Sequence, residues 1–182
     1  MDINRVYLLM FLILSPGMSR MTSRIVCDHR IILVYVNRTK TMEERLAKQC
    51  ADQNMLLAPI TLPNVEVRVG EWKNMTTSQQ GTEVFSQLNH FLNVTHNVKA
   101  PECFYTELKK LTHSVYEIKG LVNKAWRYAN NSTPITPEVN PVSQDVISNN
   151  STDIMDIFQR FSKLLRGKVT FLMQALREGN CR

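Results

Sequence analysis

The sequence is poor in the motifs that catalysis and metal binding require. Its four histidines lack the His-x-x-x-His spacing that places two imidazoles on one helical face for zinc: His29, His90, His96 and His113. There is no Gly-rich phosphate loop, no nucleophile motif and no recognisable pair of catalytic acids. Only groups that folding brings together could still form such a site. We therefore expect no enzyme activity, no metal, no cofactor and no binding to nucleic acid.

Long apolar runs are also missing. The uncharged run from Val6 to Leu14 follows Arg5 and is too short for a membrane span of about 20 residues. Small and helix-breaking residues come next, and Gly17 and Ser19 suit a cleavage site, so residues 1–19 are a predicted signal peptide. A signal anchor is the alternative, which the polar stretch after Leu14 disfavours. We expect a secreted, extracellular protein with one domain over residues 20–182.

Acidic residues are outnumbered, with 16 Asp and Glu against 22 Lys and Arg, for a formal charge of +6. The excess survives removal of the signal peptide, because Asp2 and Arg5 cancel. A basic secreted domain could attract an acidic receptor surface, heparan sulfate or a membrane. Charge alone does not choose among them, so weak heparan sulfate binding is retained as an alternative.

Cysteine is scarce too, with four residues that allow three pairings in an oxidising compartment. Asparagine, by contrast, is frequent in Asn-x-Ser/Thr triplets, the acceptor sequence for N-glycosylation. The triplet at Asn131 is the weakest, because Pro134 follows it. We predict a glycoprotein whose acceptors are drawn from Asn37, Asn74, Asn93, Asn130, Asn149 and Asn150.

The stretch from Phe158 to Leu176 has the clearest functional pattern. Its apolar residues recur at steps of three and four, as on one buried helical face: Ile154, Phe158, Phe161, Leu165, Val169, Leu172 and Leu176. Gly167 lies within this helix although glycine there costs about 1 kcal/mol relative to alanine. Phe171, beside Lys163 and Thr170, is predicted to point outward. The simplest interpretation of the pattern alone is a solvated face with one stray aromatic residue.

Three further helices are predicted, over residues 25–46, 77–94 and 101–125. The second should direct Thr82, Phe85, Leu88 and Leu92 inward. Long connections cover residues 50–72 and 129–152, and the alternation of Val65, Val67 and Val69 predicts a short edge strand in the first of them. Long, short and long connections indicate an all-α, up-up-down-down four-helix bundle of the cytokine type.

The cysteines can be placed on this topology. Cys27 and Cys50 flank the first helix and would lie about 30 Å apart, which excludes a bond between them. The start of the first helix adjoins the end of the last, and the end of the first adjoins the start of the third. The topology therefore predicts the disulfides Cys27–Cys181 and Cys50–Cys103.

Three segments resemble the erythropoietin/thrombopoietin family of class I helical cytokines: CDHR from Cys27, LPNVEVRVGEWK from Leu62 and LLRGKVTFLM from Leu164. The resemblance covers essentially the whole mature chain, and GEWK points to the thrombopoietin branch of the family. It implies a monomeric haematopoietic cytokine that binds and dimerises a class I cytokine receptor, two copies per hormone. Janus kinase/STAT signalling and megakaryocyte or thrombocyte growth would follow. The alternative is an erythropoietin-like hormone acting on red-cell precursors.

The resemblance also implies two receptor-binding faces. The high-affinity face would comprise Arg166, Gly167, Lys168, Phe171 and Lys163 of the last helix, with Pro63, Glu71 and Lys73 of the first connection. The second face would use Asp28 and Arg30 with part of the third helix. Val34, Tyr116 and Thr170 depart from the family, because each stands where a basic residue is usual. Arg166 and Lys168 flank the apolar stripe, so either could instead cover the edge of the core.

Overall fold

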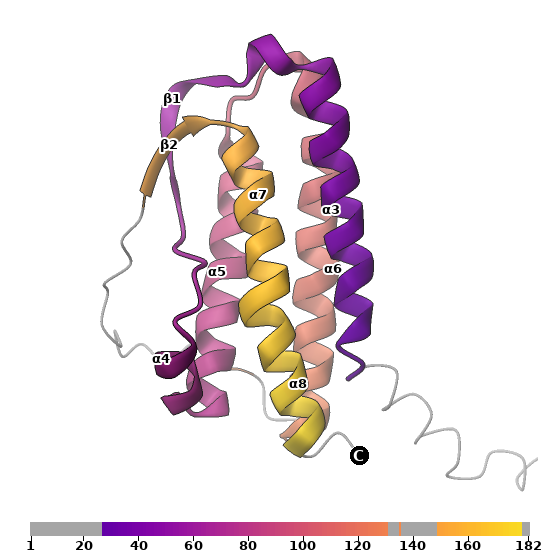
Figure 1. Cartoon of the computed structure of the whole chain (residues 1–182), viewed down its shortest axis with the longest axis vertical. Helices are drawn as coiled ribbons and strands as arrows, with labels where there is room; N and C mark the ends of the chain where they lie inside the picture. Colours follow the sequence, from indigo (N-terminus) through magenta and orange to yellow (C-terminus); the bar gives the residue numbers. More distant parts are fainter. Residues whose placement is uncertain (1–26, 131–134, 136–148, 180–182) are drawn as a thin grey trace, which may run out of the picture.

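Four long helical segments lie side by side in the computed structural model, which describes residues 27–130, 135 and 149–179 (Figure 1). They are α3 (Arg30–Gln49), α5 (Thr77–Asn97), α6 (Tyr105–Ala129) and a fourth helix made of α7 (Met155–Leu164), η3 (Leu165–Val169) and α8 (Thr170–Gly179). The predicted signal peptide and Cys181 lie outside the described residues.

The order and direction of these helices confirm the predicted bundle. α3 and α5 run one way, and α6 and the fourth helix run the other way (Figure 1). α3 packs against α6 and α7, whereas α5 packs against α6 and α8. Only residues 98–101 and the short η2 (Glu102–Phe104) join α5 to α6. The two remaining connections therefore have to cross the length of the bundle.

The core is formed by the apolar faces of all four segments. Every residue of the predicted stripe from Ile154 to Leu176 is at most 2% exposed. Phe91 of α5 meets Phe161 of α7 edge to face, with ring centroids 5.5 Å apart and planes at 66°. Fully burying each such side chain contributes about 1.5–3 kcal/mol. This packing fixes the rotation of the fourth helix, and thus which of its residues face outward.

The first connection has a different structure from the one predicted. The strand is β1 (Met55–Leu62), and it pairs antiparallel with β2 (Asn149–Asp153) from the second connection, Leu62 opposite Asn149. A strand in the first connection is thus confirmed, but its predicted location at Val65, Val67 and Val69 was wrong. Residues 63–68 form no strand in the described structure, and Val69 begins a short helix, α4 (Val69–Asn74). A short η1 (Ala51–Gln53) precedes β1.

The start of α5 is fixed by a capping box. Thr76 Oγ1 accepts from the backbone N–H of Gln79, and the Gln79 side chain accepts from the N–H of Thr76. The buried face differs in part from the predicted one, because Thr82 and Phe85 are only half-buried while Val84 and Phe91 are fully buried. The buried face of α5 includes Gly81, where a Cβ would lie 2.6 Å from the Trp126 ring of α6, so the glycine allows α5 to pack closely on α6.

The cysteines are described in part. Cys27 is buried and disulfide-bonded, and its predicted partner Cys181 lies outside the described residues. Cys50 and Cys103 are free thiols next to each other in the structure. Burial and a hydrogen bond with Cys103 raise the pKa of the Cys50 thiol to about 11. The Cys50–Cys103 bridge therefore stays a prediction.

Candidate functional site

The first connection is held on the bundle by side chains that bond to its backbone. Gln80 Nε2 donates to the Trp72 carbonyl over 2.9 Å, and Gln87 Nε2 donates to the Asn64 carbonyl over 2.8 Å. His90 Nε2 lies 2.8 Å from the Thr61 carbonyl. All three donors come from α5. They position the segment from Asn64 to Val67 beside the fourth helix.

Lys168 adds a fourth anchor from the opposite side. Its Nζ donates to the Asn64 carbonyl over 2.9 Å and lies 2.7 Å from Glu83 Oε1 of α5. Lys168 is only 4% exposed, so its ammonium is tied to its own chain. In the free protein Lys168 therefore stabilises this surface, and its contact with a receptor stays a prediction.

The glycine at position 167 is also explained by a contact within the chain. A Cβ at this position would lie 2.7 Å from Cγ2 of Val67, closer than real Cβ contacts allow. The close approach that glycine permits is therefore made by this chain's own first connection. A partner could reach Gly167 only at the part that Val67 leaves open.

The helix carries a π-helical turn at this point, η3. The Thr170 hydroxyl donates to the Leu165 carbonyl over 2.7 Å and so satisfies a backbone group of the widened turn. π-turns within α-helices occur frequently at functional sites. The turn changes the angle at which side chains of α8 follow those of α7, and Gly167 is its central residue.

Together these features form a groove of about 530 Å³ between the first connection and the fourth helix. It is here called the D-helix groove, where D denotes the fourth helix. Its lining residues are Val65, Glu66, Val67, Lys163, Arg166, Gly167 and Phe171. Arg166 and Lys163 are exposed, and Phe171 is 38% exposed. Four of the predicted contact residues, Lys163, Arg166, Gly167 and Phe171, are thus brought together.

Two cations, Lys163 and Arg166, and one carboxylate, Glu66, line the groove. Arg166 donates to Ser162 Oγ over 2.9 Å, which orients the guanidinium. Burial raises the pKa of Glu43 on α3, and Arg166 opposes that shift, so the cation lies within reach of α3. Arginine and aromatic side chains are enriched at the energetic centres of protein interfaces. The arrangement suits a partner with acidic and apolar groups.

A family model described as "Erythropoietin/thrombopoietin" matches residues 24–182. The chain belongs to the erythropoietin/thrombopoietin family. This is a family of cytokine hormones rather than of enzymes. Within the parts of the chain that the structure describes, His, Cys, Asp and Glu form no group that could hold a metal, and no helix is long and apolar enough to cross a membrane.

Both branches of the erythropoietin/thrombopoietin family appear among the relatives. Rat thrombopoietin is 25% identical over 150 residues, which cover 81% of this chain and 42% of the rat protein. Dog thrombopoietin is 24% identical over 177 residues, 95% of this chain and 47% of the dog protein. Pig erythropoietin is 24% identical over 177 residues, which cover 91% of this chain and 90% of the pig protein. The chain therefore spans less than half the length of these thrombopoietins.

The other residues that the family resemblance predicted lie outside the D-helix groove. Pro63 is buried, while Glu71 and Lys73 are exposed on α4, where Glu71 pairs with Arg68 at 3.2 Å. None of the three lines the groove. They stay predictions as contacts of a larger surface around it.

The residues of the expected second face make contacts within the chain. Asp28 and Arg30 pair with each other at 2.7 Å at the start of α3, and the hydrogen bond from Arg30 lowers the pKa of Asp28 to about 2. Val34 is 55% exposed. Tyr116 instead meets His96 of α5, with a 3.2 Å hydrogen bond and ring centroids 5.9 Å apart. Tyr116 thus lies at the junction of α5 and α6.

The predicted glycosylation sites differ in accessibility. Asn37, Asn74, Asn93 and Asn150 are exposed, while Asn130 is half-buried and donates to the Trp126 carbonyl. Asn149 is in β2, and its side chain and Asn131 are outside the described set. Glycan occupancy stays a prediction at all of these positions.

Sequence reasoning missed Val65, Glu66 and Val67, which form the opposite wall of the groove. The alternation of these residues suggested a strand, but the useful signal was Gly167. A glycine inside a helix predicts that another segment approaches closely. The partner segment itself could be identified only from the tertiary structure.

Proposed function

We propose that this protein is a secreted, glycosylated haematopoietic cytokine that binds a class I cytokine receptor through the D-helix groove. The signal peptide over residues 1–19 and the Asn-x-Ser/Thr triplets support secretion. Dimerising two receptor copies around one hormone would bring their Janus kinases together and start STAT signalling. The second receptor copy would contact the start of α3, near Asp28 and Arg30.

The observation that carries the proposal is the combination of Arg166, Lys163 and Phe171 on one groove. Phe171 is 38% exposed and shares the groove with these two cations. Four side chains anchor the backbone of the first connection, which forms the opposite wall. Such rigid presentation lowers the entropy lost on binding. A receptor-binding surface is the function that this arrangement fits best.

We propose growth of the megakaryocyte and thrombocyte lineage as the output, because GEWK at residues 70–73 resembles the thrombopoietin branch. Erythropoietin-like action on red-cell precursors is the second candidate. It is supported by pig erythropoietin, which matches with an identity similar to that of the thrombopoietins. The two candidates differ in the receptor they require.

The test compares cells that carry the thrombopoietin receptor with cells that carry the erythropoietin receptor, both from the species of the hormone, in a STAT reporter assay. A response restricted to the first cells is expected. It should rise and then fall at excess hormone, because each receptor copy is then occupied singly. Activity on neither cell type would contradict the proposal, and activity only on the second would establish the alternative.

The Arg166→Ala variant tests the groove. We expect it to bind receptor more weakly by at least about 2 kcal/mol, the level of an interface hot spot, without a change in unfolding temperature. Arg127→Ala, which removes an exposed arginine of α6, is the matched control and should bind normally. Full potency of Arg166→Ala would show that the groove is not the contact.

A further inference from the structure

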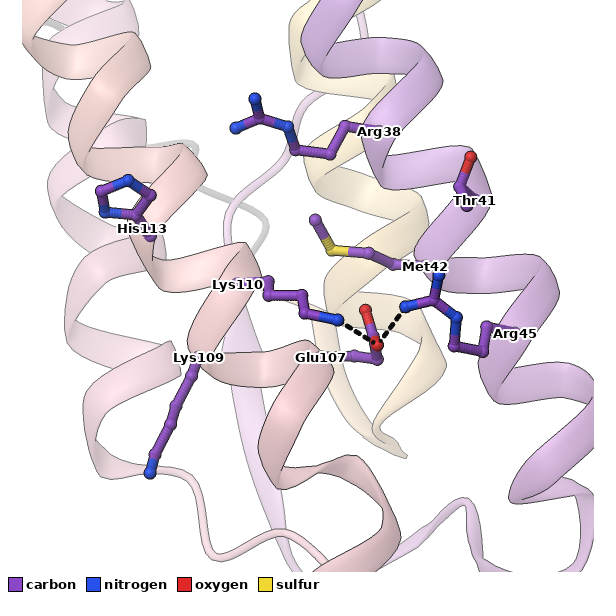
Figure 2. Close-up of a pocket in the computed structure, with 8 residues that line it drawn as sticks. All are labelled: Arg38, Thr41, Met42, Arg45, Glu107, Lys109, Lys110 and His113. Atoms are coloured by element: carbon purple, nitrogen blue, oxygen red, sulfur yellow. Dashed lines mark hydrogen bonds and ion pairs between the residues drawn. The ribbon is translucent and has the colours of Figure 1, made fainter.

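A second groove lies between α3 and α6 (Figure 2), and it shares no lining residue with the D-helix groove. It has a volume of about 590 Å³. It is here called the A–C groove, because it lies between the first (A) and third (C) long helices. Its lining residues are Arg38, Thr41, Met42 and Arg45 of α3 and Glu107, Lys109, Lys110 and His113 of α6. Asp28 and Arg30 lie at the start of α3, about two turns before Arg38, the first residue of this groove.

The charges of this groove are unbalanced. Four cations line it, Arg38, Arg45, Lys109 and Lys110, and His113 adds a fifth when protonated. Two carboxylates oppose them: Glu107 within the groove, and Glu117, which pairs with Arg38 at 2.8 Å. Lys109 forms no ion pair within the described ranges. The surplus of two positive charges favours an anionic ligand.

Internal contacts hold three of the four cations, Arg38, Arg45 and Lys110, in place before any ligand arrives. Glu107 Oε1 accepts from Arg45 over 2.6 Å and from Lys110 over 2.8 Å (Figure 2). Arg38 also lies over the Tyr35 ring, 5.0 Å from its centroid. Because these side chains are already ordered, a ligand that binds them loses less entropy than it would on free lysines.

The floor of the groove adds a requirement for hydrogen-bond donors. The Glu107 side chain is 5% exposed, and its Oε2 is buried without a hydrogen-bond partner in the protein. A buried acceptor of this kind is stabilised by a ligand hydroxyl or N–H. The best ligand therefore carries anionic groups and hydroxyl donors side by side, as sulfated sugars do.

We propose that the A–C groove binds a segment of a sulfated glycosaminoglycan. Sulfate groups pair with Arg38, Lys110 and Lys109, while sugar hydroxyls face Glu107. An acidic peptide matches less well, because it supplies fewer charges per unit length to a groove that already contains carboxylates. The inference goes beyond receptor binding and rests only on the extracellular location in the proposed function.

The experiment measures binding of the secreted full chain to a heparin oligosaccharide by surface plasmon resonance at about 0.15 M salt. Arg38→Gln with Lys110→Gln should weaken binding by at least about tenfold. The control, Lys40→Gln with Arg127→Gln, removes one Lys and one Arg from exposed positions of the same two helices and should change it by less than about threefold. Lys109→Gln, which breaks no internal ion pair, is a second variant should the first unfold.

Three results would overturn the inference. No binding at this salt concentration would leave only weak, non-specific attraction. Equal losses in the groove and control variants would show that net charge alone matters. Polyglutamate that binds as tightly as the oligosaccharide would identify an acidic peptide as the ligand instead. Arg166→Ala should keep full heparin binding, so failure of the receptor proposal and failure of this one are distinguishable.

Discussion

Lys168 is a charged residue at a core position of the fourth helix. It lies between the buried residues Leu165 and Leu172 and is itself only 4% exposed. Its ammonium is satisfied by Glu83 and the Asn64 carbonyl. One side chain therefore links the fourth helix, α5 and the first connection.

We predict that Lys168→Ala lowers the free energy of unfolding by about 2 kcal/mol, because a buried hydrogen bond and an ion pair are lost while the partly exposed Glu83 can rehydrate. Denaturant unfolding measures this. Lys163→Ala, an exposed lysine on the same helix, should stay within about 0.5 kcal/mol of the parent. Weaker receptor binding by Lys168→Ala with unchanged unfolding would instead make Lys168 a direct contact.

Gly167 offers a second test at the residue scale. Gly167→Ala should displace Val67 from the groove and cost about 1–3 kcal/mol through overpacking. Combining it with Val67→Ala should recover most of the loss, as a double-mutant cycle on unfolding would show. Gly120→Ala is the control, since no atom lies within 4 Å of the added Cβ and helix propensity should give a gain of up to about 1 kcal/mol. Additive effects of the first two changes would contradict the contact.

At the scale of elements, Glu107 joins α3 to α6. Burial alone would raise the pKa of Glu107, but hydrogen bonds from Lys110 and Arg45 outweigh it and hold the pKa below the ordinary value of 4.5. The stabilising contribution of this carboxylate is therefore present above about pH 4.5 and is lost as the pH falls through the lower folded-state pKa.

We predict that Glu107→Gln lowers the free energy of unfolding at neutral pH by about 1–2 kcal/mol, less than for a fully buried cluster because both cations are nearly half exposed. The difference from the parent should shrink as the pH falls from 4.5 through the lower folded-state pKa of Glu107. Urea unfolding across this pH range measures it, with the exposed Glu44→Gln as control. A difference that stays constant with pH would exclude the carboxylate as its source.

The helices were predictable from sequence, whereas the elements between them were not. Periodic apolar residues identify the buried face of the fourth helix and leave Arg166 and Phe171 outside it. β2 consists of polar residues, Asn149 to Asp153, and forms because β1 lies beside it rather than because of its own propensity. The groove wall at Val67 depends in the same way on contacts between residues far apart in the chain.

At the scale of the whole molecule, the position of Cys50 beside Cys103 joins the end of α3 to the start of α6. We predict that these thiols are oxidised to a disulfide in the secreted protein. Closing a loop of about 50 residues would stabilise the fold by roughly 4 kcal/mol in the chain-entropy model.

Peptide mapping without reductant should find the Cys50 and Cys103 peptides linked. The double variant Cys50→Ser with Cys103→Ser should unfold at a lower denaturant concentration than the parent. Reductant should then have a smaller effect on the variant than on the parent. Alkylation of both thiols in the native secreted protein would contradict the prediction.

The π-turn at Leu165–Val169 holds one residue more than a regular α-helical turn does. Deleting one residue here would therefore restore a regular helix and leave α8 in nearly the same orientation, with Leu172 and Leu176 still in the core. The change would fall on the widened turn itself, where the Thr170 hydroxyl bonds to the Leu165 carbonyl and Gly167 meets Val67. In comparisons with other chains, a one-residue gap at this point would therefore signal an altered binding surface over an unchanged core, even where every neighbouring side chain is the same.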